Sequence, residues 1–232
     1  MNTFQIADWL EKRKTLSYGK TALKAVSKLP QSIKDNTIIL IGPMGTGKSS
    51  TAKVLRDVRH MDRVSLDNKD RFKKIYEKKP KFRYFKNFEF VLTCSVLATL
   101  KEPQIIDFGA GHSVYEDKEV FALMKQICSQ FKHVFLLLPT RNGINPDGSI
   151  DVSKNAQILS KRVQNDKHRP WEGNQHFRRR MEDNNHFLTC HCNYELATKI
   201  IYQEDKDPEQ VAILIDDEMN KVNKEKGERN EK

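Results

Sequence analysis

The stretch IILIGPMGTGKSS, residues 38–50, constrains the fold more than any other part of the sequence. Four apolar residues run into a turn with three glycines, and Lys48 and two serines follow. This is the order of the G-x-x-x-x-G-K-[ST] motif, which lies between a buried strand and a helix. Its glycines let backbone N–H groups approach phosphate oxygens without a Cβ in the way. The sequence therefore predicts a polyphosphate-binding loop in an α/β domain.

The loop residues predict how a nucleoside triphosphate would be held. Lys48 can reach the β and γ phosphates, and the hydroxyl of Ser49 can ligate Mg²⁺. The other expected contacts come from Gly42, Met44, Gly45, Thr46, Gly47 and Ser50. We therefore expect ATP and Mg²⁺ as cofactors. The alternative is a glycine turn that only joins a strand to a helix.

Two acidic residues follow strand-like segments. Asp107 ends QIID, where a carboxylate would hold a magnesium water, and Asp67 ends RVSLD, nineteen residues after Lys48. Because the carboxyl ends of parallel strands face the ligand crevice, Asp67 could orient an acceptor hydroxyl and take its proton. The alternatives are structural: Asp67 would cap a helix or a turn, and Asp107 would belong to a turn before Gly109.

Strand and helix patterns alternate along the chain, which favours a doubly wound sheet. The expected strands are 37–41, 63–66, 104–108, 133–138 and 198–202. Helices are expected at 3–29 (two short ones), 48–58, 69–79, 82–100, 116–131, 153–165, 176–196 (one or two) and after Asp207. The fold class is therefore an α/β three-layer sandwich with a mainly parallel five-stranded sheet and extra N-terminal helices. Residues 141–152 are turn-rich and are expected to form an inserted loop.

The net charge of +10 is concentrated in two segments. Residues 69–86 carry nine Lys and Arg against two acids, and residues 161–180 carry seven against two. Such a concentration favours anionic ligands. Aromatic residues are interleaved with the first segment, so nucleic acid is a possible partner. The alternative is that the aromatic residues belong to the core and the lysines cover its edge.

The sequence contains no apolar run of membrane-spanning length and no apolar signal core at its N-terminus. The four cysteines do not resemble a disulfide framework. We therefore expect a soluble cytoplasmic protein. His186, Cys190, His191 and Cys192 lie close together, and His186 and Cys190 are spaced to share one helix face. They could bind zinc, or they could be half-buried helix residues.

With these residues identified, the chain from about Asn36 to Ile215 resembles the shikimate kinase family of small P-loop kinases. IILIGPMGTGKSSTAKVL resembles the opening strand, loop and helix of that family, and VSLD lies where the family has D-x-D. The resemblance implies that Asp67 is the base-like aspartate, while Ser65 takes the place of the first aspartate, which helps to bind magnesium. DFGAG resembles the glycine triplet that binds the acceptor, which implies that role for Gly109, Ala110 and Gly111.

The same resemblance implies a helical lid over residues 160–182. LSKRV and HRPW match an adenine-side arginine and the Arg-Pro of the lid, which assigns adenine stacking to Arg162 and phosphate contact to Arg169. The two arginines that grip the acceptor carboxylate in the family are not matched. One position falls on Cys190 and the other near Phe85, with Arg83 as a shifted candidate. Shikimate itself is therefore not the expected acceptor.

These observations predict an N-terminal helical extension (1–35), a kinase domain (36–218) and a charged flexible tail (219–232). The expected activity is an ATP- and Mg²⁺-dependent transfer to a hydroxyl of an anionic small molecule, with Lys48, Asp67 and Arg169 as catalytic residues and Ser49, Ser65 and Asp107 at the metal. Two alternatives remain open: a kinase acting on a nucleic acid or a nucleotide, and a nucleotide-binding regulatory module. The sequence does not indicate an oligomeric state.

Overall fold

The computed structural model describes residues 12–68, 85–166 and 174–230. The strands are β1 (Ile38–Ile41), β2 (Asp62–Ser65), β3 (Gln104–Asp107), β4 (His133–Leu138), β5 (Gly143–Ile144), β6 (Ile150–Asp151) and β7 (Lys199–Tyr202). The helices are α1 (Lys12–Ser27), α2 (Gln31–Asn36), α3 (Lys48–Arg59), α5 (Phe85–Ala98), α6 (Lys118–Cys128), α7 (Ser153–Gln164), α8 (Asn174–Thr189), α9 (His191–Leu196) and α10 (Pro208–Asn230), with a 3₁₀ turn, η3, at Ala110–Ser113.

The main sheet has five strands in the order β2-β3-β1-β4-β7, and all four pairings are parallel. Strand β1 is central and fully buried, and its side chains alternate between two cores. Ile39 and Ile41 face one core, whereas Ile38 and Leu40 face the other. A strand buried on both faces reads as a continuous apolar run, which is why IILI was recognisable. The predicted fold class is confirmed.

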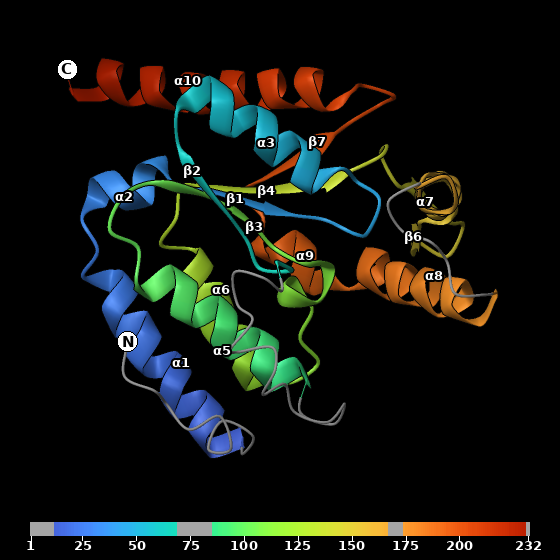
Figure 1. The fold of residues 1–232 in the computed structure, drawn as a ribbon, viewed down its shortest axis with the longest axis horizontal. Coiled ribbons are helices and arrows are strands. Elements are labelled where there is room, and N and C mark those ends of the chain that lie inside the picture. The colour runs from blue at the N-terminus through green and yellow to red at the C-terminus, as the bar shows by residue number, and fades with distance from the viewer. Residues whose placement is uncertain (1–11, 69–84, 167–173, 231–232) are drawn as a thin grey trace.

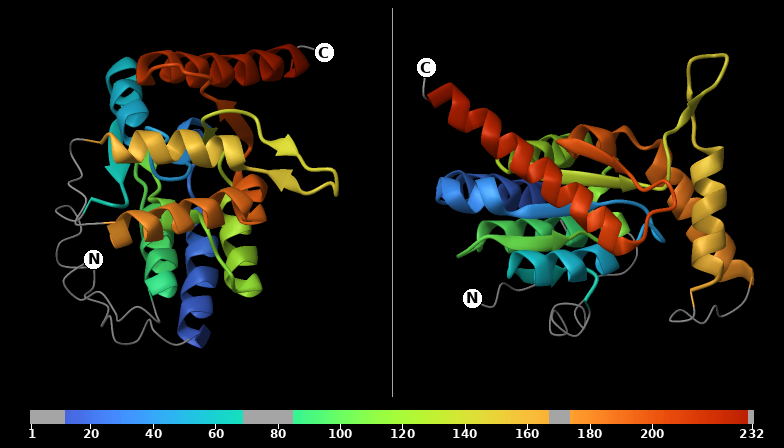
Figure 2. Two further views of the ribbon diagram at one scale, coloured as in Figure 1. Left: turned by 90° about the vertical axis from the view of Figure 1, so that its right-hand side faces the viewer. Right: turned by 90° about the horizontal axis from the view of Figure 1, so that it is seen from above.

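Helices cover both faces of the sheet and complete the three layers (Figure 1). Helices α3 and α10 lie on one face, while α5, α6 and α9 lie on the other and α1 packs outside α5 and α6. Helices α7 and α8 and the β5–β6 hairpin gather at one end of the sheet, as Figure 2 shows from two further directions. That end carries the loop between β1 and α3, so the helices that enclose the phosphate-binding loop come from the C-terminal half of the chain.

The N-terminal helix α1 is part of the packed domain. Ala22 and Val26 are buried in the core that α5 and α6 share. The hydroxyl groups of Tyr18 and Ser95 lie 2.5 Å apart. A Cβ at Gly19 would lie 2.7 Å from the ring of Phe90, so only glycine lets α1 approach α5 this closely.

The described part of residues 3–29 forms one helix, and the other expected helix lies largely outside the described residues. Three other segments differ from the sequence-based expectation. Helix α2 was not predicted; Pro30, interpreted as the end of a helix, is its N-cap. Residues 141–152, expected to form a loop, contain the two short strands β5 and β6. The segment from Asn220, expected to lack fixed structure, is helical to Asn230.

Among the described residues, none of the helices combines the length and the apolar character needed to cross a bilayer. All four cysteines are free thiols, and Cys94, Cys128 and Cys192 are buried.

Candidate functional site: a phosphate-binding loop facing an acidic cluster

The loop between β1 and α3, residues 42–49, is the P-loop of this structure. Gly45 and Gly47 have φ angles of 89° and 72°, a region that only glycine adopts without strain. At Gly42 a Cβ would lie 2.9 Å from both the carbonyl oxygen of Leu137 and the hydroxyl of Thr46. The three glycines are thus required by the backbone path itself, which turns directly into the N-terminus of α3.

Lys48, the first residue of α3, is buried and folds back onto the P-loop. Its Nζ donates to the carbonyl oxygens of Gly42 and Pro43, at 2.8 and 3.1 Å. These bonds hold the ammonium group over the loop in which the polyphosphate is expected. Thr46 is fully buried and its hydroxyl donates to Pro43 O at 2.9 Å, whereas Ser50 is exposed on the first turn of α3.

Ser49 and Asp107 meet beside the P-loop, as the sequence predicted for the metal-binding pair. The hydroxyl of Ser49 donates to Oδ2 of Asp107 at 2.6 Å, and Asp107 is only 2% exposed. Arg63, on the neighbouring strand β2, donates from a guanidinium nitrogen to the same oxygen at 3.1 Å. Ser65 ends β2 directly opposite Asp107 in the strand register. Sequence reasoning missed Arg63, because the residue follows no motif and reaches Asp107 only through the strand pairing.

Two buried amides, distant in sequence, fix the P-loop from outside. Asn184 on α8 accepts from the N–H of Met44 at 2.8 Å and donates to the carbonyl oxygen of Met44 at 3.0 Å. Gln203, just after β7, donates to the carbonyl oxygen of Thr46. Both amide residues are almost completely buried. No sequence signal pointed to them, since a single Asn or Gln in a polar segment has many structural roles.

Arg162, assigned to the adenine side, lies next to Gln203 and the P-loop. It donates to Oε1 of Gln203 at 2.6 Å, so it is linked to the P-loop through one amide. Burial lowers the pKa of its guanidinium from the usual value. Helix α7 also packs directly on the loop: a Cβ at Gly45 would lie 2.9 Å from a methyl group of Val163. The adenine-side position expected for Arg162 is thus compatible with its contacts.

Across from the P-loop lie four side chains, two of them acidic, that we call the Asp67 cluster: Asp67, Lys86, Glu89 and His112. Asp67 follows β2 and its side chain is 66% exposed, yet it lies against the backbone at Gly109. A Cβ at Gly109 would come within 2.0 Å of its Oδ1. The same oxygen lies 4.0 Å from Nε2 of His112. Asp67 and Gly109, paired by the sequence analysis, are therefore brought together.

The buried half of the Asp67 cluster was not anticipated. Glu89 on α5 is 5% exposed, and a Cβ at Gly111 would lie 2.0 Å from its Oε1. Nζ of Lys86 lies 3.0 Å from Oε2 of Glu89 and donates to the carbonyl oxygen of Gly111 at 3.1 Å. Lys86 and Glu89 are one helical turn apart, a spacing too common to single them out. They form a paired charge beside the glycine segment.

His112 forms the buried wall of the cluster. Its Nδ1 lies 2.9 Å from the hydroxyl of Thr93, which itself donates to the carbonyl oxygen of Glu89 at 2.8 Å. Because the single hydroxyl proton of Thr93 is used in that bond, Nδ1 of His112 is the donor to the hydroxyl oxygen of Thr93. Burial lowers the pKa of His112, and the charges of Glu89 and Asp67 offset this only in part. A neutral imidazole thus lies behind Asp67 at neutral pH.

Two predicted site residues, Arg83 and Arg169, lie outside the described residues, as does most of the basic segment 69–86. Ala110 begins the 3₁₀ turn η3 between the two glycines that contact Asp67 and Glu89. Cys190, at the position of an expected acceptor arginine, is a half-buried free thiol. Among the described residues, Lys86 is the cation that the structure places beside Gly111.

Sequence comparison finds shikimate kinases among the relatives of this chain. No family model matches the chain. The shikimate kinase of Staphylococcus aureus strain MRSA252 is 30% identical over 139 residues, which cover 57% of this chain and 66% of the relative. The shikimate kinase of Staphylococcus epidermidis is 33% identical over 138 residues, which cover 57% and 67%. The aligned region thus spans about two thirds of the length of these relatives.

Structural comparison agrees with the sequence. A structure of the shikimate kinase of Acinetobacter baumannii in complex with shikimate matches with a TM-score of 0.52 and 19% identity, covering 83% of this chain and 94% of that one. The shikimate kinase of Bacteroides thetaiotaomicron gives a TM-score of 0.50 at 17% identity. At this identity the likeness concerns the fold, while the family follows from the sequence match. The chain therefore belongs to the shikimate kinase family of small P-loop kinases.

Proposed function

We propose that this protein transfers the γ-phosphoryl group of ATP to a hydroxyl group of an anionic small molecule other than shikimate. The observation that carries the proposal is the 2.6 Å hydrogen bond from Ser49 to Asp107 at the mouth of the P-loop. A hydroxyl after the P-loop lysine and a buried carboxylate at a strand end are the pair that positions Mg²⁺ in such kinases.

The residues present fit Mg²⁺ and ATP. Mg²⁺ prefers oxygen ligands and keeps several waters, and Ser49 and Asp107 offer a hydroxyl and a carboxylate side by side. The P-loop backbone and Lys48 would hold the phosphates, and Arg162 would lie at the adenine side. When bound, the metal and the nucleotide supply the phosphoryl group and neutralise its charge. Ser65, Ser50 and Arg169 keep their expected supporting roles in this proposal.

Asp67 is the residue that we assign to the acceptor hydroxyl. Its carboxylate is exposed at a strand end and lies against Gly109, and so it can accept the hydroxyl proton. The neutral ring of His112 behind it adds no positive charge that would compete for the carboxylate. Gly109, Ala110 and Gly111 would form the backbone surface against which the acceptor lies.

The charges favour an acceptor different from shikimate. Lys86, the described cation next to Gly111, is already paired with the buried carboxylate of Glu89. Cys190 carries no charge to offer to an acceptor carboxylate when it is a thiol. The basic segment 69–86, including Arg83, would then recognise the charge of the acceptor. The need for ATP makes the cytoplasm the expected location.

The test is incubation of the purified protein with γ-labelled ATP, Mg²⁺ and a pool of small metabolites, followed by identification of the labelled product. Parallel reactions contain shikimate alone, RNA or DNA. Lys48→Ala is the inactive control, because loss of a charge that stabilises the transferred group costs about 10²–10³-fold in rate. A labelled small anion supports the proposal. Label on shikimate or on nucleic acid, or label released only as phosphate, would overturn the assignment of the acceptor.

A further inference from the structure

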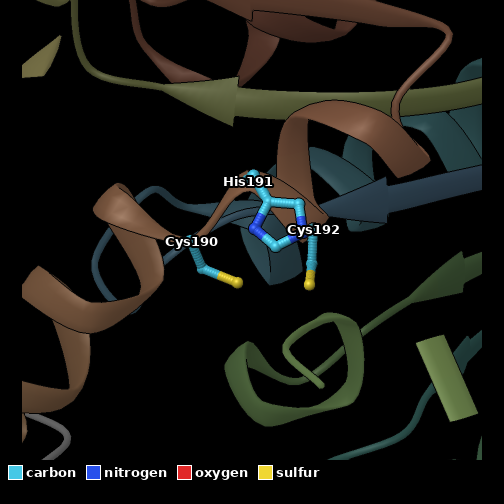
Figure 3. A group of neighbouring side chains, drawn as sticks. All are labelled: Cys190, His191 and Cys192. Carbon is cyan, nitrogen blue, oxygen red and sulfur yellow. The ribbon is translucent and has the colours of Figure 1, made fainter. Parts of the chain in front are cut away.

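The turn between α8 and α9 brings three metal-binding side chains together. Cys190 is the N-cap of α9 with an extended backbone (φ −71°, ψ 118°), and His191 and Cys192 begin the helix. Because the chain changes direction at Cys190, consecutive side chains converge instead of pointing apart. Both sulfur atoms and one imidazole nitrogen lie within 4.8 Å of one another. Figure 3 shows the ring of His191 between the sulfur atoms of Cys190 and Cys192.

The donor types are those of a zinc site. Thiolate sulfur and imidazole nitrogen are the ligands of tetrahedral structural zinc, with bonds of about 2.3 and 2.0 Å. Tetrahedral angles at those bond lengths put donors about 3.5–3.8 Å apart. The observed spread of at most 4.8 Å requires only small side-chain adjustments to reach that geometry. Hard cations such as Mg²⁺ avoid sulfur ligands, so these donors favour a thiophilic divalent cation.

A pocket adjoins these three residues, and a further imidazole, that of His186, lines it without lying within the group of three. The pocket has a volume of about 370 Å³, and its lining includes Glu116, His186, Cys190 and His191. His186 lies one helical turn before Cys190, whose N–H bonds to the carbonyl oxygen of His186 at 3.0 Å. Nε2 of His186 lies 3.9 Å from the carboxylate of Glu116. Carboxylates in this position orient metal-binding imidazoles.

His191 has a similar carboxylate partner. Its Nε2 lies 3.7 Å from Oε1 of Glu195, and the other oxygen of Glu195 is held by Lys125 at 2.6 Å. The ring also makes an edge contact with Phe121, at 5.5 Å between centroids. A surface imidazole is thus fixed by two neighbours, although its side chain is 72% exposed.

We propose that Cys190, His191 and Cys192, together with His186, bind a thiophilic divalent cation of the zinc type. This proposal does not depend on the proposed kinase chemistry. The site would serve as a structural clamp, because four protein ligands leave no open position for a reactant. In the metal-free protein the thiol of Cys192 donates to the carbonyl oxygen of Tyr115 at 3.3 Å, two residues after η3. Binding as a thiolate would replace this hydrogen bond with a bond to the cation, so the cation would hold the α8–α9 turn through its own ligands.

Cobalt is the probe for this proposal, because Co²⁺ accepts zinc ligands and reports their geometry by its colour. The full-length protein, reduced and freed of metal by a chelator, is titrated with Co²⁺ and then with Zn²⁺. We expect one Co²⁺ per chain, a thiolate-to-cobalt charge-transfer band, the intense visible bands of tetrahedral cobalt, and loss of all bands when Zn²⁺ is added. Zn²⁺ should also raise the melting temperature, since a ligand bound only by the folded state stabilises it.

Variants decide whether these residues form the site. Cys190→Ser and His191→Gln change side chains that are not fully buried, and each should weaken Co²⁺ binding at least about tenfold. Thr189→Ala on the same turn is the control and should bind as the wild type does. Metal uptake without tetrahedral bands, which indicates adventitious binding, would overturn the proposal. So would bands that persist in both variants, or a Cys190–Cys192 disulfide in protein isolated without reductant.

Discussion

The P-loop and the Asp67 cluster lie at the same end of the sheet but are built differently. The P-loop is held by backbone conformation and by buried neutral amides: its glycines have φ angles closed to other residues, and Asn184 binds both polar groups of Met44. The Asp67 cluster is built from charged side chains, in which Lys86 pairs with the buried Glu89 and Asp67 remains exposed.

This difference indicates how one fold can keep a nucleotide and change its acceptor. A site made of backbone N–H groups is specified by glycines and tolerates few substitutions, because Gly45 and Gly47 have positive φ angles and a Cβ at Gly42 or Gly45 would meet a neighbour. A site made of side-chain charges can be altered one residue at a time without moving the backbone. We therefore expect changes in the Asp67 cluster to affect turnover and acceptor choice while leaving nucleotide affinity intact, and changes around the P-loop to do the reverse.

The largest expected effect is that of Asp67→Asn. The amide keeps the size of the side chain but cannot take a proton, so turnover in the labelled-ATP assay should fall by about 10²–10⁴-fold. The dissociation constant for ATP, measured by calorimetry, should stay within about threefold, because Asp67 lies on the other side of the site. Unchanged turnover would remove Asp67 from the chemistry, and a large loss of ATP affinity would contradict the separation of the two regions.

The P-loop could be predicted from the sequence more completely than the Asp67 cluster, for a physical reason. Backbone positions that only glycine can occupy, whether by positive φ (Gly45 and Gly47) or by lack of space for a Cβ (Gly42), leave a trace in the sequence at fixed spacing. Buried parallel strands leave another, because residues such as Ile38–Ile41 must be apolar on both faces. The motif, the five-stranded parallel sheet and the expectation that Ser49 and Asp107 lie at one metal followed from these local patterns.

What could not be predicted depends on contacts between distant segments. Asn184 reaches Met44 across 140 residues of chain, and Arg63 meets Asp107 only because β2 pairs with β3. Lys86 is the last residue of the basic segment 69–86 and Glu89 lies three residues beyond it, in a region where the acceptor was expected to be bound by arginines. Helix α2 was missed because a proline can end one helix or begin the next. None of these features has a local pattern of its own.

A second prediction concerns the position of Asp67 instead of its charge. In Gly109→Ala the new Cβ would lie 2.0 Å from the carboxylate oxygen, so Asp67 has to rotate away. The backbone at Gly109 (φ −60°, ψ 154°) suits alanine, and the exposed Asp67 can move at little cost in stability. Turnover should fall about 10- to 100-fold, since small misplacements of catalytic groups have effects of this size.

A wild-type rate in Gly109→Ala would show that the contact between Gly109 and Asp67 does not position the carboxylate. A loss of melting temperature as large as that of a core substitution would instead show that Gly109 serves the fold. Only reduced turnover with unchanged ATP affinity agrees with the division between the two regions.

Asn184→Ala tests the other side of the comparison. It leaves the N–H and carbonyl groups of Met44 without their buried partner, and an unsatisfied buried polar group costs about 1–3 kcal/mol. Part of that cost should appear as nucleotide affinity weakened about tenfold, because ATP must then order a looser loop. Calorimetry with ATP measures it, and Asn185→Ala, on the exposed face of α8, is the control. Equal affinities for ATP in the two variants would show that Asn184 has only a structural role.

The smallest expected effect is a pH dependence of stability that originates in the Asp67 cluster. Burial lowers the pKa of His112 below its ordinary value of 6.5, while Glu89 and Asp67 raise it in part and Lys86 lowers it further. As the pH falls below 6.5, the unfolded chain binds a proton that the folded chain refuses, so the free energy of unfolding decreases until the pH reaches the lowered native pKa. The free energy of unfolding changes by at most about 1.4 kcal/mol per pH unit for one group.

Urea unfolding between about pH 5 and pH 7 should therefore show a steeper loss of stability with falling pH for the wild type than for His112→Gln. His133, whose pKa is lowered to about 4 by burial, contributes equally to both proteins, so it does not affect the difference in stability between them. Equal slopes would mean that His112 titrates as if it were exposed, and the Asp67 cluster would then be open to water on its inner side as well.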